Sequence, residues 1–254
     1  MKHILVIAAA FTALNLNAST ITALFNGELN SENIQRFIID DPTNPGWVDT
    51  TTGIFTFTRT AGTAPLPTGT FLAFCIEPRE FVSGGSTYTY DFSDLEQGTT
   101  NIGGMGVTKA NLIRELFGRF EPVLGGPVFD PNLNQIRPEN ALYESAFQIA
   151  LWEIVRETSG TLNVSDGNIT FRNPQDAATL AFAQTMLSSL TGTGPRLNDL
   201  YALTNVGAQD VLVQVDFPAP EPFGLVTTGG ALIGIAMMLR RRQAKGCASA
   251  RTPR

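Results

Sequence analysis

Two apolar segments, one at each end of the chain, limit the part of the sequence that can form a globular fold. At the N-terminus, a short basic stretch over residues 1–3 precedes the apolar run 4–14, and Ala18 ends a small-residue cleavage site. This order is typical of a secretory signal peptide, which is removed from the mature protein. We therefore predict a signal peptide over residues 1–18 and a folded domain over residues 19–216.

The C-terminal segment combines an extended linker, an apolar stretch and a basic cluster. The linker contains Pro220, Glu221 and Pro222, and each proline keeps the residue before it out of the α region. Residues 223–239 carry no charge, and this length is at the short limit for a transmembrane helix. The basic cluster that closes this helix, and favours a cytoplasmic end, consists of Arg240, Arg241 and Arg242.

This three-part order over residues 217–242, followed by a basic tail over 243–254, resembles the PEP-CTERM sorting signal of Gram-negative bacteria. The resemblance implies that signal peptidase and an exosortase process the chain. It also implies a transient intermediate anchored in the inner membrane, and then export to the cell surface or extracellular matrix. The alternative is a plain, permanent membrane anchor.

The composition between the two ends excludes several classes of function. Hydrophobic residues make up 43% of the chain, which is enough for a sizeable core. Residues 19–218 contain 10 basic and 22 acidic residues, and such a surface repels nucleic acid. The only His is His3 and the second Cys is Cys247, so a chain processed at both ends has no His and a single Cys, Cys75. Ser-His-Asp triads, Cys/His zinc clusters and an intramolecular disulfide are then impossible.

Hydrophobic periodicity predicts strands, then a block of helices, then a closing strand. The predicted strands cover residues 54–59, 70–76, 86–92 and 211–217, the second of them as an inner strand. The predicted helices cover residues 108–119, 138–158 and 173–192, and the predicted loops cover 40–46, 98–106 and 122–138. This order predicts an α+β fold, with a β-sandwich or barrel and the helices clustered on one side as a helical subdomain.

Three acidic segments, at residues 40–41, 91–94 and 166–168, offer carboxylates to a cation such as Ca²⁺. None of them has the spacing of an EF-hand loop. We interpret all three as solvated loops, and the sequence predicts neither a metal site nor a cofactor.

Two residues do not fit their apolar surroundings. Cys75 lies alone on the predicted inner strand, and Gln148 lies in the middle of an apolar helix, where an unsatisfied amide is costly. Attack of the Cys75 sulfur on the Gln148 side-chain carbonyl, with loss of ammonia, would join the two as a thioester. A fold that holds thiol and carbonyl in contact can drive this step, and a dry aromatic wall protects the product. The candidates for that wall are Phe74, Phe147 and Trp152.

The segments 74–76 and 147–152 are similar to the aromatic-Cys-apolar and apolar-Gln-x-x-apolar-Trp motifs of bacterial surface thioester domains. The resemblance covers residues 19–216 and implies a β-sandwich or barrel with a helical subdomain. It also implies a thioester between Cys75 and Gln148 that couples once to an amine on a partner, a protein Lys or an amino sugar, for adhesion or matrix cross-linking. Such a protein is a single-use binding module and not a turnover enzyme. The alternative is a non-covalent structural or carbohydrate-binding matrix protein in which Cys75 is merely buried, while a hydrolase lacks a recognisable nucleophile–base pair.

Overall fold

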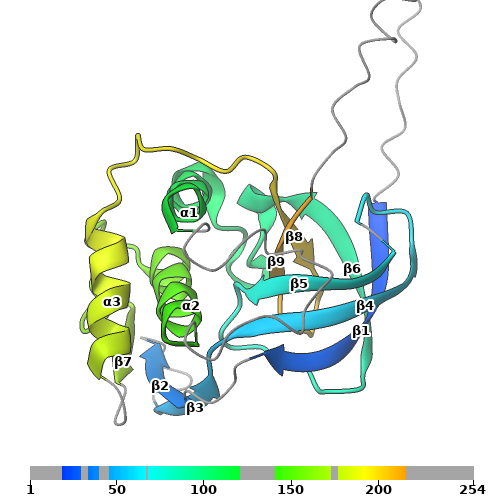
Figure 1. Ribbon diagram of the computed structural model, residues 1–254, viewed down its shortest axis with the longest axis horizontal. Helices are drawn as coiled ribbons and strands as arrows, with labels where there is room; N and C mark the ends of the chain where they lie inside the picture. The colour runs from blue at the N-terminus through cyan, green and yellow to red at the C-terminus, as the bar shows by residue number, and fades with distance from the viewer. Residues whose placement is uncertain are drawn as a thin grey trace, which may run out of the picture. The chain divides into compact units, whose positions relative to one another are not determined.

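A closed barrel of six antiparallel strands lies at the centre of the fold (Figure 1). The computed structural model describes residues 19–29, 34–39, 46–66, 68–120, 141–172 and 177–215, all within one compact unit that ends at Val215. Around the barrel the order of strands is β1 (Ser19–Leu29), β4 (Ile54–Gly62), β5 (Gly69–Cys75), β9 (Val211–Gln214), β8 (Leu200–Thr204) and β6 (Thr87–Asp94).

Strand β1 closes the barrel because it pairs with β4 on one side and with β6 on the other. Its register with β4 shifts between Thr22 and Ala23 and again between Phe25 and Gly27. Such bulges bend a strand and increase its twist, as closure requires. The barrel core includes Phe57, which stacks on Phe71 with ring centroids 5.5 Å apart and meets the edge of Tyr90 at 6.0 Å.

The remaining elements form a helical part with a small sheet of its own. The helices are α1 (Gly106–Phe120), α2 (Ala141–Arg156) and α3 (Ala177–Ser188), preceded by the short 3₁₀ helices η1 (Leu95–Gln97) and η2 (Thr100–Ile102). The small antiparallel sheet has the order β3 (Val48–Thr51), β2 (Ile34–Ile39), β7 (Ile169–Arg172). Figure 1 shows the three helices on one side of the barrel, with the end of β5 directed towards α2.

Helix α2 is buried on nearly all sides, with every residue from Glu144 to Val155 in the interior. An apolar helix of this kind must be covered all round. It packs against α3 and α1 and meets the end of β5, and Figure 1 shows it between the barrel and α3. This central place puts Gln148 in the core.

The α+β class, the barrel, the strands over 54–59, 70–76 and 86–92 and the three helices are confirmed in position and type. The prediction of a loop at residues 91–94 is wrong, because these residues pair with residues 201–204 of β8 and belong to β6. The closing strand ends earlier than predicted, at Gln214, and the second and third helices end at Arg156 and Ser188. At residues 91–94 the pairing with β8 outweighs the local turn preference.

Among the described residues, no helix has the length and apolar character needed to cross a membrane. The predicted signal peptide, the sorting segment over 217–242 and the basic tail lie outside the described residues. So do nearly all of the predicted loops 40–46 and 122–138.

Candidate functional site

Cys75 and Gln148, which lie 73 residues apart in the sequence, are in direct contact. Cys75 is the last residue of β5, and its backbone N–H donates a hydrogen bond to Gln148 Oε1 at 3.1 Å. Gln148 Nε2 donates in turn to the Cys75 carbonyl oxygen at 2.7 Å. Both side chains are buried. The structure therefore places the Gln148 amide group against the residue that carries the thiol.

Trp152 contacts the Cys75 sulfur atom from the same side of α2 as Gln148. Its Nε1–H donates a hydrogen bond to Cys75 Sγ at 3.3 Å. Residues four apart lie on one face of a helix, so Gln148 and Trp152 form a single stripe facing Cys75. The backbone of Cys75 contacts the first residue of this stripe, and its thiol contacts the second.

Paired hydrogen bonds between a Gln amide and the backbone occur elsewhere in this chain. Gln184 accepts from the Val164 N–H at 3.1 Å and donates to the Leu162 carbonyl at 3.2 Å. Such pairing satisfies a buried amide without any covalent bond. What distinguishes Gln148 is that its partner residue carries the thiol, and that the Cys75 N–H polarises the Gln148 carbonyl as an oxyanion-hole donor would.

Burial raises the pKa of the Cys75 thiol well above its ordinary value. The Trp152 N–H and the backbone amide of Glu77 oppose this effect, while the carboxylates of Glu77 and Glu28 add to it. The thiol is therefore protonated at neutral pH. Any reaction at this sulfur needs a group that takes up its proton.

The three predicted shielding residues belong to two separate aromatic clusters. Phe74 and Phe147 pack with ring centroids 5.0 Å apart, and both contact Phe117 of α1. Trp152 instead packs against Phe171 and Phe37, with its ring 5.7 Å from that of Phe37. The hydrogen bond to the thiol places Trp152 directly at the sulfur, whereas Phe74 and Phe147 fill the neighbouring junction of β5, α1 and α2.

The sequence did not reveal an ion pair that lies one helical turn beyond Trp152, on the same face of α2. Glu77 is 1% exposed, and its Oε1 lies 3.8 Å from Nη1 of Arg156, at the end of α2. Burial raises the pKa of Glu77 to about 7. The available signal was a charged residue directly after the apolar run 71–76.

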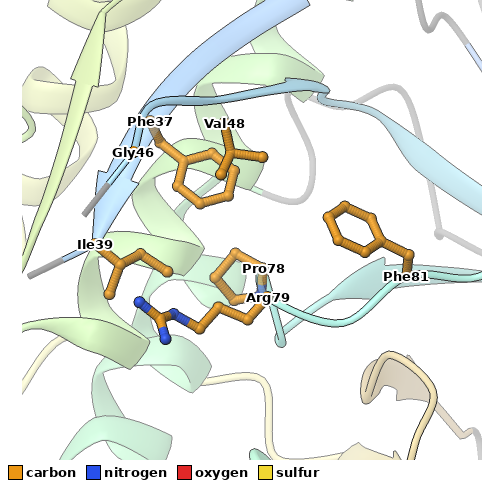
Figure 2. A pocket seen from close by; sticks show the side chains of 7 residues that line it. All are labelled: Phe37, Ile39, Gly46, Val48, Pro78, Arg79 and Phe81. Carbon is orange, nitrogen blue, oxygen red and sulfur yellow. The ribbon is translucent and has the colours of Figure 1, made fainter. Parts of the chain in front are cut away.

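A pocket of about 290 Å³ lies next to the Trp152 cluster (Figure 2). Phe37 lines this pocket and also packs on Trp152, so one ring links the opening to the residue at the sulfur. Figure 2 shows Pro78 below Phe37, the Arg79 side chain extending towards Ile39, and the exposed Phe81 on the opposite side of the pocket. The volume is at the lower limit for small-ligand sites, which suits a group the size of a side chain.

Comparisons of the chain with protein-family models, with curated proteins and with solved structures give no match. Within the described residues, no cluster of three or more His, Cys, Asp or Glu side chains could hold a metal ion.

Proposed function

We propose that this protein forms an internal thioester between Cys75 and Gln148 and couples through it to amine-bearing molecules. The observation that carries the proposal is the buried contact of the two residues. The Gln148 amide is hydrogen-bonded to the Cys75 backbone, and the Cys75 thiol accepts a hydrogen bond from Trp152. Contact between a buried cysteine and a buried glutamine supports the proposal, because such contact gives the high effective concentration that the reaction needs.

Formation of the thioester joins Sγ to the Gln148 side-chain carbon and releases Nε2 as ammonia. The Cys75 N–H, which already donates to Oε1, would stabilise the negative charge that develops on this oxygen. In the coupling step an amine attacks the same carbon, an amide bond forms, and the sulfur leaves and regains a proton. The Trp152 N–H supports the departing sulfur.

The amine comes from a protein Lys or an amino sugar on a cell surface or in an extracellular matrix. We expect such a group to approach through the pocket lined by Phe37 and Phe81, because Phe37 also packs on Trp152. Export by signal peptidase and an exosortase, through an intermediate in the inner membrane, would deliver the protein there. Each molecule reacts once, as an adhesive or cross-linking module.

Intact mass measurement of protein purified in amine-free buffers tests the proposal. The wild type should be lighter than its sequence by one ammonia, and methylamine should add to Gln148 and free one thiol. Cys75→Ala and Gln148→Ala should each abolish the mass deficit and the adduct. The Cys75 truncation leaves only a small cavity, at a cost of about 1–2 kcal/mol.

Gln184→Ala is the matched control, because Gln184 pairs with backbone in the same way but has no thiol beside it. This variant should keep the deficit and the methylamine adduct. A wild-type protein with full sequence mass and a free thiol would refute the thioester. The function would then be that of a non-covalent structural or carbohydrate-binding matrix protein, in which Gln148 simply satisfies the backbone of Cys75.

A further inference from the structure

Three residues of α2, spaced one helical turn apart, contact the chain at the end of β5, at Cys75 and Glu77. Gln148 pairs with the backbone of Cys75, Trp152 donates to the Cys75 sulfur, and Arg156 faces the carboxylate of Glu77. The backbone amide of Glu77 also faces the sulfur and lowers the pKa of the thiol. Glu77 therefore faces the same side of α2 as Cys75, next to the two residues that react.

The reaction of Cys75 with Gln148 has a proton to move. The thiol must lose its proton before sulfur attacks, and the amide nitrogen must gain one before ammonia can leave. Burial opposes a free thiolate at this position, and bulk water has little access to a residue that is 0% exposed. A buried carboxyl group two residues along the chain, whose charge acts on the thiol, could serve both steps.

We propose that Glu77 transfers this proton, a proposal that rests on the thioester function. The Glu77 carboxylate accepts the proton from Cys75 Sγ as the bond from sulfur to the Gln148 side-chain carbon forms. The resulting carboxylic acid gives the proton to Nε2, the carbon–nitrogen bond breaks, and ammonia leaves. One proton moves from sulfur to nitrogen, and Glu77 ends in its starting state.

The surroundings of Glu77 suit a group that both accepts and donates a proton. Its carboxylate oxygens make no hydrogen bond of normal geometry with the described residues. Arg156 of α2 and the Asn101 side chain of η2 lower its pKa, whereas burial, Asp210 and Glu80 raise it, with a result of about 7. Near neutral pH both protonation states are populated, which is the favourable condition for general acid–base catalysis.

The test uses ammonia to reopen the thioester, because ammonia restores Gln148 and the free Cys75 thiol. After ammonia is removed, thioester re-formation is followed by the returning mass deficit and by the loss of titratable thiol. Glu77→Gln should slow re-formation by roughly 10²–10⁴-fold, the range typical of general acid–base groups. The wild-type rate should rise as the pH passes through about 7, as Glu77 becomes the carboxylate, and then level off.

Two further variants separate proton transfer from a structural role. Glu153→Gln is the matched control, because Glu153 is also buried in α2 with a raised pKa, but its Oε1 accepts from the Asn163 N–H. This control should re-form the thioester at the wild-type rate. Glu77→Asp should recover part of the rate and the pH-dependent step, since it restores a carboxylate.

Wild-type rates in Glu77→Gln, an unchanged pH profile in that variant, or no recovery in Glu77→Asp would each overturn the role of Glu77 while leaving the thioester in place. A wild type without the mass deficit would instead overturn the thioester function itself. The two failures are therefore distinguishable.

Discussion

Trp152 occupies two roles that a single substitution can separate. Its ring packs with Phe37 and Phe171, and its Nε1–H donates to the Cys75 sulfur at 3.3 Å. Trp152→Phe keeps an aromatic ring in the cluster but removes the donor. Trp152→Ala removes both the donor and the ring.

The loss of the donor should slow coupling to amines. In that step the sulfur leaves with negative charge, and a hydrogen bond to a charged group contributes about 1.5–3 kcal/mol. The Trp152 bond also lowers the thiol pKa against the effect of burial, so without it the sulfur is a poorer leaving group. We expect methylamine to react about 10- to 100-fold more slowly with Trp152→Phe than with the wild type.

Trp152→Ala should show the opposite behaviour towards water. Removing a buried indole costs about 3–5 kcal/mol, a large fraction of a typical stability of about 5–15 kcal/mol. In molecules that still fold, water enters beside the sulfur, and the thioester should hydrolyse faster than in the wild type.

Both rates are measured by intact mass over time, with methylamine for coupling and without amine for hydrolysis. Circular dichroism confirms that each variant remains folded. If Trp152→Phe couples to methylamine at the wild-type rate, the indole N–H has no part in the departure of sulfur, and this reasoning is wrong.

Three further predictions concern access, pH and export. Phe37→Leu should open the wall between the pocket and Trp152. The rates of hydrolysis and of methylamine coupling should then rise roughly tenfold, which corresponds to a change of about 1.4 kcal/mol in the barrier. Phe81→Ala, at an exposed position of the same pocket, should leave both rates unchanged. Burial and the neighbouring Glu157 raise the pKa of Glu153 from 4.5 to about 8, although the hydrogen bond from the Asn163 N–H lowers it. The contribution of Glu153 to the free energy of unfolding should therefore fall as the pH rises from about 4 to 8. Glu153→Gln should reduce that dependence in thermal unfolding measured over this pH range, and an unchanged profile would contradict it. Terminal peptide mapping of exported protein should find a start near Ser19 and no Cys247, and recovery of Cys247 on the external form would exclude the proposed processing.

Local patterns in the sequence were sufficient for many elements and for the two residues at the centre of the site. Alternation of apolar and polar residues marks β4, and a continuous apolar run marks β5 as an inner strand, because side chains of a strand point to opposite faces in turn. The same reasoning singled out Cys75 and Gln148, since each is a chemical exception within an apolar element. These signals are local and can be recognised from the order of residues along the chain.

Other elements carried no such signal. Strand β1 contains a bulge at Asn26, and β7 is only four residues long. Both depend on neighbours distant in the sequence, as β7 does on its pairing with β2. Residues 91–94 show the same effect, because pairing with β8 makes a strand of a segment whose composition favours a turn.

The site as a whole was decided by the tertiary structure. Closure of the barrel and burial of α2 bring together residues 73 positions apart, and they place Arg156 opposite Glu77 and Phe37 against Trp152. A charged residue after a strand and a phenylalanine in a short strand are unremarkable in the sequence, and their surroundings give them their chemistry. The sequence by itself determined which side chains could react, whereas only the packing of α2 across the end of β5 determined which groups touch them, because contact and burial depend on the path of the whole chain.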